Sequence, residues 1–275
     1  MRIDAHHHFW KFDPVEYGWL GEKMKALRRD FLASDLEAAA KTAGVDGVVS
    51  VQVRQTLGEN EFMLDIADRA GIVRGVVGWA PLVEADVETH LERFAAHPKF
   101  KGVRYILQDE PANALMDDAD FNRGVSKLSQ FNLVYDVLIY ERHLEQAIRF
   151  VDRHPNQVFV LDHVAKPRIK DGVREPWATL MRELARRPNL YCKISGMATE
   201  AAWETWTSTD IEPYIDVVLE AFTPRRLMFG SDWPVMLVAS DYPRWAVTVE
   251  GAIAKLSAGE QARIWSGTAV EAYRL

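Results

Sequence analysis

Short apolar runs rich in β-branched residues alternate along the whole chain with longer amphipathic stretches. Parallel strands that are buried on both faces read as continuous apolar runs, whereas the helices that cover them repeat every 3.6 residues. The apolar runs predict eight strands, over residues 2–9, 45–53, 73–80, 100–107, 133–139, 158–164, 190–195 and 227–234. This alternation indicates repeated βα units around a parallel sheet.

The amphipathic stretches between these runs predict the helices of the βα units. The first helix has a capping-box pattern, Ser34-Asp35-Leu36-Glu37, with Ser34 as the expected N-cap. The helices are expected over residues 34–43, 60–69, 86–96, 142–153, 177–187, 211–222, 258–266 and 269–274. Eight such units in 275 residues predict a single-domain (β/α)8 TIM barrel over residues 1–275. An open doubly wound sheet fits less well, because no glycine-rich turn follows the first run.

Charge and cysteine content narrow the expected partners and location. The formal net charge is −7, from 33 basic and 40 acidic residues, and no basic run occurs. We therefore expect no nucleic-acid or membrane partner. The chain opens directly on a strand-like run rather than a signal segment, and its single cysteine, Cys192, rules out an intrachain disulfide. These features predict a cytoplasmic protein, and they leave open whether it forms a homo-oligomer.

Polar side chains and one tryptophan fall near the ends of the predicted strands. In a barrel the carboxyl ends of all strands meet at one face, where barrel enzymes place their catalytic groups. A buried polar group without a partner costs about 1–3 kcal/mol, so stability alone explains such a set poorly. The set comprises His6, His8, Gln52, Trp79, Arg104, Asp136, His163, Lys193, Ser195 and Asp232.

His6 and His8 are the first candidates. Side chains two apart on a strand share a face, and this face points inward if Ile3 and Ala5 pack outward. Two adjacent imidazoles can hold a metal ion or polarise a substrate oxygen. His7 then points away and is predicted to be structural.

Three further side chains are catalytic or binding candidates. Asp232 directly follows an apolar run and could take a proton from water, or it could cap the next segment. His163 is either catalytic or a satisfied loop histidine. An inward Arg104 needs an anionic or carbonyl partner, either a substrate or a salt bridge to Asp136 or Asp232. The remaining substrate contacts are expected from Gln52, Trp79, Lys193 and Trp233.

Other histidines and the cysteine are given structural roles. The side chains of His90, His97, His143 and His154 fall between the predicted strands and are assigned to the solvated surface. Cys192 alternates away from Lys193, which predicts a buried, unreactive thiol.

Five sequence blocks together resemble the amidohydrolase superfamily, and within it the amidohydrolase-2 lactonases, closest to L-fuconolactonases and L-rhamnonolactonases. The blocks are residues 4–10 (DAHHHFW), 101–104 (KGVR), 161–167 (LDHVAKP), 193–196 (KISG) and 229–234 (FGSDWP). The resemblance implies that water opens a lactone to its hydroxy acid. It implies that Asp232 is the general base, that His6, His8 and His163 surround the carbonyl, and that Arg104 binds the substrate.

The chain departs from metal-dependent members of that superfamily at two strands. These members usually carry a lysine or glutamate on strand four and a histidine on strand five, where this chain has Arg104 and Tyr135-Asp136. A bridged two-metal site therefore lacks ligands. A single divalent ion such as zinc, held by His6, His8 and Asp232, fits the sequence, and so does a metal-free site. Lactones are activated esters, so no cofactor is strictly required.

Two alternatives remain beside hydrolysis of an aldonolactone such as L-fuconolactone. One is metal-dependent, nonoxidative decarboxylation of an aromatic acid, which the short chain and the opening block disfavour. The other is a noncatalytic sugar-binding protein, which the grouping of acid and histidines disfavours. The sequence leaves the stereochemistry and ring size of the lactone open.

Overall fold

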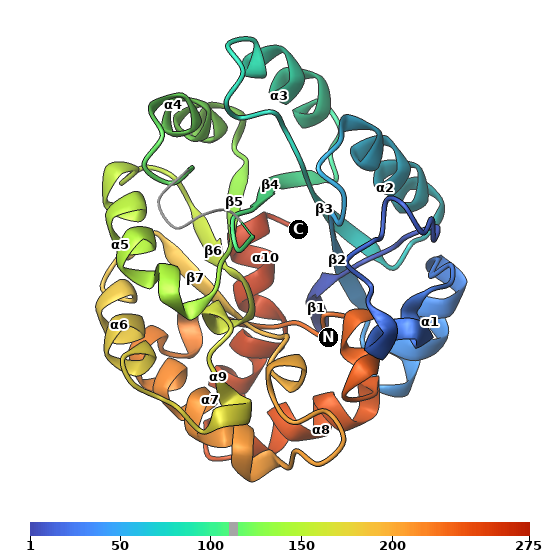
Figure 1. Cartoon of the computed structure of the whole chain (residues 1–275), viewed down its shortest axis with the longest axis vertical. Coiled ribbons are helices and arrows are strands. Elements are labelled where there is room, and N and C mark those ends of the chain that lie inside the picture. The colour runs from blue at the N-terminus through green and yellow to red at the C-terminus, as the bar shows by residue number, and fades with distance from the viewer. Residues whose placement is uncertain (110–114) are drawn as a thin grey trace.

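A closed barrel of parallel strands forms the centre of the computed structural model, which describes residues 1–109 and 115–275 (Figure 1). Eight strands pair in chain order, and every pairing is parallel. This confirms the (β/α)8 barrel. The strands are β1 (Ile3–His7), β2 (Gly47–Val51), β3 (Val73–Gly78), β4 (Phe100–Ile106), β5 (Val134–Leu138), β6 (Phe159–Leu161), β7 (Leu190–Ile194) and β8 (Leu227–Phe229).

The segment after β8 closes the barrel against β1. Trp233 forms a parallel bridge with His7, and its carbonyl accepts a hydrogen bond of 2.7 Å from His8 N. Asp232 N donates to His6 O at 2.8 Å. The backbone of the closing segment is thereby tied to the strand that carries His6 and His8.

Helices surround the strands as expected, with two corrections. The ring consists of α1 (Ala33–Thr42), α2 (Leu57–Arg69), α3 (Val87–Ala95), α4 (Ala119–Lys127), α5 (Leu144–Arg153), α6 (Trp177–Leu184), α7 (Ser208–Phe222) and α8 (Tyr242–Ile253), followed by α9 (Ala258–Ala262) and α10 (Thr268–Tyr273). The sequence pattern did not predict α4 or α8. The expected cap at Ser34 is wrong, because α1 already begins at Ala33 and the Asp35 carboxylate accepts from Leu32 N.

A small apolar cluster fills the barrel interior. It joins Ile3 and Ala5 of β1 to residues of five other strands, which only the barrel interior can bring together. From the end of the chain, Ala269, Ala272 and Tyr273 belong to the same cluster. Figure 1 shows α10 at the centre of the ring of strands. Directly after α10, Arg274 O accepts from Lys101 Nζ at the start of β4, so this segment lies at the end opposite the strand carboxyl ends. Among the described residues, no helix is long and apolar enough to cross a membrane.

Candidate active site

His6 and His8 lie at the end of β1, but not by simple alternation. Ile3 and Ala5 face the interior, so the expectation that they pack outward is wrong. The register of β1 against β2 shifts between Asp4 and His7, and this bulge turns His6 inward as well. His7 points away and bonds the Ser50 hydroxyl at 2.8 Å, which confirms its structural role.

The orientation of His8 is set by the neighbouring strand. Its Nδ1 lies 2.8 Å from the carbonyl oxygen of Val51, which can only accept, so Nδ1 carries the proton. Its Nε2 then faces Asp232 Oδ1 at 3.2 Å and His6 Nε2 at 3.2 Å. Such a carbonyl partner on the second ring nitrogen is typical of metal-binding histidines.

His6 is fully buried, and burial holds its pKa well below the ordinary value, so the ring is neutral. Its Nε2 faces Arg104 Nη1 at 3.3 Å, and its Nδ1 lies 3.2 Å from Asp162 Oδ1. A guanidinium can only donate and a carboxylate can only accept, so Arg104 and Asp162 favour the proton on Nδ1, whereas the Lys193 ammonium, 3.1 Å from Nδ1, favours a lone pair there. In either case Nε2 of His6 faces the site beside Nε2 of His8.

Asp232 follows β8 in a left-handed backbone conformation, with φ of +62°. Burial raises the pKa of its carboxyl, but His163, His8 and Lys166 favour the charged form and the net shift is downward. The side chain is therefore ionised at neutral pH. A fully buried carboxylate, Asp4, holds the turn that carries it, because Asp4 accepts from Ser231 N at 2.8 Å and from the Tyr242 hydroxyl.

His163 comes from the short turn η4 (Asp162–Ala165) that follows β6. Its Nδ1 lies 2.9 Å from the Ser195 hydroxyl, and its Nε2 lies 3.9 Å from Asp232 Oδ1. Burial lowers its pKa to about 4, so it too is neutral near pH 7. Gly196 leaves room for the ring, since a Cβ there would lie 2.6 Å from His163 Nδ1.

The atoms of His6, His8 and Asp232 that face one another fit a single metal ion. Their spacings are 3.2 Å between the two Nε2 atoms, 3.2 Å from His8 and 3.7 Å from His6 to Asp232 Oδ1. Tetrahedral zinc with bonds of ~2.0–2.2 Å separates its ligand atoms by about 3.3–3.5 Å. When both Nε2 atoms are unprotonated, the three atoms present lone pairs to one point, an arrangement that a cation stabilises.

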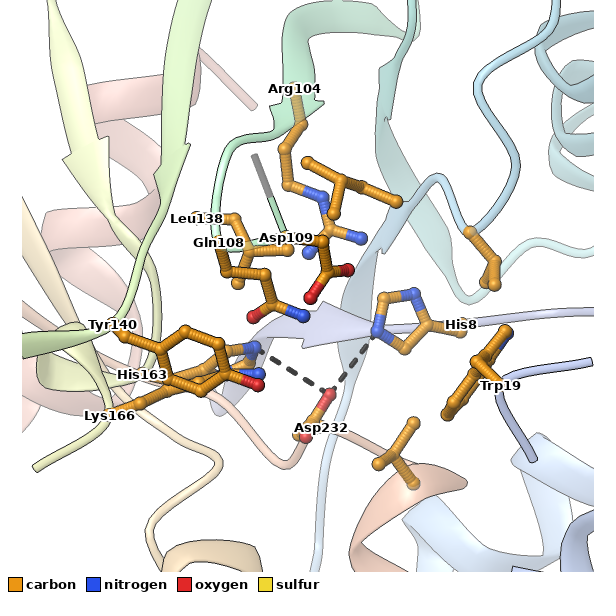
Figure 2. Close-up of a pocket in the computed structure, with 13 residues that line it drawn as sticks. His8, Trp19, Arg104, Gln108, Asp109, Leu138, Tyr140, His163, Lys166 and Asp232 are labelled. Atoms are coloured by element: carbon orange, nitrogen blue, oxygen red, sulfur yellow. Dashed lines mark hydrogen bonds and ion pairs between the residues drawn. The ribbon is translucent and has the colours of Figure 1, made fainter. Parts of the chain in front are cut away.

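His8, His163 and Asp232 open onto a cavity of about 340 Å³, whereas His6 is fully buried and does not line it. Figure 2 shows His163, Tyr140 and Lys166 on one side of Asp232 and Trp19 on the other. Gln108 and Asp109 lie above the carboxylate (Figure 2). The apolar part of the lining comes from Trp19, Val53, Ile106, Leu138 and Val235. The cavity thus combines an apolar side with several hydrogen-bonding groups, as small polar ligands require.

The structure brings only part of the expected substrate-contact set to this cavity. Arg104 lines it, together with His8, His163 and Asp232. Four expected contacts do not line it. Gln52 is buried and binds Arg104 through its side-chain and carbonyl oxygens, and Lys193 is fully buried. Trp79 packs against Tyr105, and Trp233 packs against Phe31.

A buried ionic network, which the sequence reasoning missed, supports the site from below. Asp162 lies 3.1 Å from Arg104 Nη1 and 2.9 Å from Lys193 Nζ, and Lys193 Nζ donates to Asp136 at 2.6 Å. The cations Arg104 and Lys193 hold the pKa of Asp162 well below its usual range, against the effect of burial. The sequence does mark Asp162 as a candidate, because it directly precedes His163 at a strand end. The pattern could not show which groups it would meet.

Lys166 was also missed as a site residue, because it lies beyond the predicted strand end, where periodicity gives no position. The surface assignment of two histidines is wrong, since His143 and His154 are buried. Cys192 is buried, as expected, and burial raises the pKa of its thiol far above the ordinary value.

Three histidines and an ionised carboxylate lie together at the strand carboxyl ends of an eight-stranded parallel barrel. This arrangement is that of a barrel enzyme. The chain belongs to the amidohydrolase family, whose profile matches residues 3–275. It is 39% identical to the L-fucono-1,5-lactonase of Burkholderia multivorans and 36% identical to that of Burkholderia ambifaria. Each match covers 100% of this chain and 96% of the relative.

A solved structure shows the same similarity in three dimensions. An amidohydrolase from Burkholderia multivorans with bound zinc superposes with a TM-score of 0.95 at 40% identity. The match covers 100% of this chain and 99% of that chain. The resemblance seen in the five sequence blocks is thereby confirmed.

Proposed function

We propose that the protein hydrolyses a sugar-derived aldonolactone, such as L-fuconolactone, to its hydroxy acid. The observation that carries the proposal is an ionised Asp232 whose Oδ1 has ring nitrogens of His6, His8 and His163 within 3.9 Å, beside a small cavity that His8, His163 and Asp232 line. The two L-fucono-1,5-lactonases that align with the full chain support the same substrate class.

In this mechanism Asp232 is the general base. Its carboxylate takes a proton from water as the water oxygen attacks the lactone carbonyl. His163, neutral near pH 7, lies opposite His8 across Asp232 and helps to orient the water and the carbonyl (Figure 2). Arg104 places positive charge beside His6, where the developing negative charge on the carbonyl oxygen is stabilised.

His6, His8 and Asp232 would hold one divalent ion such as zinc. When bound, this ion would polarise the carbonyl and make the attacking water more acidic. Without the ion, Asp232 still supplies a base and Arg104 still supplies positive charge. We therefore propose that the ion assists the reaction without being strictly required. The zinc in the Burkholderia multivorans amidohydrolase supports the single-ion site.

The cavity lining suits a small sugar lactone. Gln108, Asp109 and Tyr140 offer donors and acceptors for hydroxyl groups, whereas Trp19 and Val53 offer apolar surface for a ring face or methyl group. We propose a cytoplasmic location, which the single buried thiol of Cys192 suits.

A pH-stat assay over a panel of 1,4- and 1,5-aldonolactones, with and without chelator, tests the proposal. We expect acid release from at least one lactone, and failure across the whole panel would refute lactone hydrolysis. Loss of activity on chelation, with recovery in zinc alone, would show a required ion. Carbon dioxide release from aromatic acids would instead identify a decarboxylase, and calorimetric binding of a sugar without acid production would identify a binding protein.

Asp232→Asn tests the general base directly. Because an amide cannot take the proton from water, we expect kcat to fall by about 10²–10⁴-fold. Asp241→Asn, at the cap of α8, makes the same chemical change away from the cavity and serves as the control. Near-normal turnover in the Asp232 variant would contradict its assignment.

A further inference from the structure

The turn that carries His163 adopts a backbone conformation that L-residues rarely sustain. His163, Val164, Ala165 and Lys166 are consecutive and have φ of +53°, +47°, +60° and +49°. Left-handed conformations are costly for non-glycine residues and normally occur singly. Strain of this kind persists where the surrounding structure enforces it, and it concentrates at functional sites.

This left-handed turn brings two side chains to the cavity. Lys166 N donates to His163 O at 2.8 Å, so the two residues are one turn apart, and both line the cavity. Val164 and Ala165 are buried between them, and the Val164 carbonyl accepts from Trp177 Nε1 at 2.8 Å. The first part of the turn positions His163. The turn then continues to Lys166, which places a second polar group in the same cavity.

The ammonium group of Lys166 is free to meet a substrate. Within residues 1–109 and 115–275, no carboxylate lies within 4.0 Å of Lys166 Nζ, which lies 5.3 Å from the centre of the Tyr140 ring. Arg104 differs, because its guanidinium is held by Asp162 and Gln52. Lys166 is thus the cation on the cavity lining whose ammonium N–H groups have no hydrogen-bond or ion-pair partner among the described residues.

The attack of water does not need a lysine, because Asp232 is the base. The opening of the ring, however, needs a proton for the leaving oxygen. When the bond between the carbonyl carbon and the ring oxygen breaks, the oxygen leaves as an alkoxide unless a proton reaches it. A positioned acid supplies that proton in the transition state. Asp232 and Lys166 both line the cavity, and Figure 2 shows Lys166 beside His163 on one side of the carboxylate.

We propose that Lys166 is the general acid for ring opening, a role that rests on the proposed lactone hydrolysis. Water oxygen bonds to the carbonyl carbon and gives one proton to Asp232. The bond from that carbon to the ring oxygen then breaks, and the ring oxygen takes a proton from the Lys166 ammonium. Asp232 returns its proton through solvent to the Lys166 amine, so lactone and water give the hydroxy acid with both residues restored.

Lys166→Met tests this role with the lactone that the wild-type enzyme hydrolyses best. We expect kcat to fall by about 100-fold or more while KM changes little, because the acid acts at ring opening. Lys170→Met, in the exposed part of the next turn η5 (Ile169–Asp171), is the matched control and should keep wild-type kcat. Near-normal kcat in Lys166→Met would overturn the proposal.

Two further measurements separate proton donation from charge and from folding. In Lys166→Ala, added methylammonium should restore part of kcat, whereas tetramethylammonium, which carries charge but no proton, should not. Lys166→Arg keeps the charge and the fold but donates a proton poorly, so it should remain slow. Full activity in the arginine variant, or equal rescue by both ions, would overturn the acid role. A wild-type enzyme inactive on every lactone would instead refute the proposed function itself.

Discussion

At the scale of single residues, the surroundings give identical imidazoles different tasks. His8 donates through Nδ1 to the Val51 carbonyl and turns Nε2 toward Asp232. His154 donates through Nε2 to the Asn122 amide oxygen at 2.8 Å, and its ring lies near Phe150 and Phe159 rather than near a reacting group. Sequence position assigned His154 to the surface, and it is buried because α5 ends against the barrel at this point.

The burial of His154 predicts a loss of stability in mild acid. Burial, and then the charge of Arg153, lower the pKa of His154 to about 4, below the 6.5 of an exposed histidine. The unfolded chain therefore binds a proton first as pH falls, so the stability contributed by the neutral ring is present above about pH 6.5 and is lost toward pH 4. Urea unfolding at pH 7 and pH 5 measures this loss.

His154→Gln should lose less stability than the wild type between these two pH values. His90→Gln makes the same change at a half-exposed site on α3 and should follow the wild type. An unchanged pH dependence in the His154 variant would show that this ring does not contribute to the loss.

At the scale of elements, short turns after the strands place the reacting groups. The turn η4 is left-handed at four consecutive positions from His163 to Lys166, and the turn after β7 carries Gly196 at φ of +63° directly against the His163 ring. The sequence blocks LDHVAKP and KISG marked both turns. Their conformations could not be predicted, because each is stable only in contact with the other.

Gly196→Ala should separate stability from activity. We expect a stability loss of about 1–2 kcal/mol from the left-handed backbone and a fall in kcat of about 100-fold, because the new Cβ displaces the His163 ring. Gly172→Ala is the matched control, since Gly172 has φ of +66° and no atom within 4 Å of the added Cβ. It should lose similar stability, measured by urea unfolding, and keep its kcat. Equal activities in the two variants would contradict the positioning role of Gly196.

At the scale of the whole molecule, the end of the chain supports the site through the barrel interior. The Tyr273 hydroxyl on α10 lies 2.9 Å from both carboxylate oxygens of Asp136. Asp136 accepts from Lys193, which lies 3.1 Å from His6 Nδ1. A continuous path of buried polar contacts thus connects the last helix to the first strand.

Tyr273→Phe should destabilise the protein by about 1–3 kcal/mol, because a buried carboxylate loses a hydrogen-bond donor. Tyr191→Phe is the control, since its hydroxyl bonds Glu271 at a solvent-exposed position, and it should change stability by less than about 0.5 kcal/mol. The free energy of unfolding in urea measures both. Equal values would show that the bond to Asp136 adds nothing to stability.

The sequence by itself determined the barrel and predicted the side chains that meet at the candidate site. Continuous apolar runs are required wherever a parallel strand is buried on both faces, so eight such runs predicted the eight strands. Polar residues at strand ends marked His6, His8, Arg104, His163 and Asp232, and the structure brings these together, because all strand carboxyl ends of a barrel meet at one face.

Only the tertiary structure decided which polar groups pair inside the barrel and which face the cavity. Lys193 and Gln52 lie at strand ends like the others, yet they bind Asp136 and Arg104 rather than lining the cavity. Lys166 lies beyond any strand, yet it lines the cavity. A left-handed turn after β6 sets the direction of Lys166, and a bulge in β1 sets that of His6. Both depend on contacts between segments far apart in the sequence.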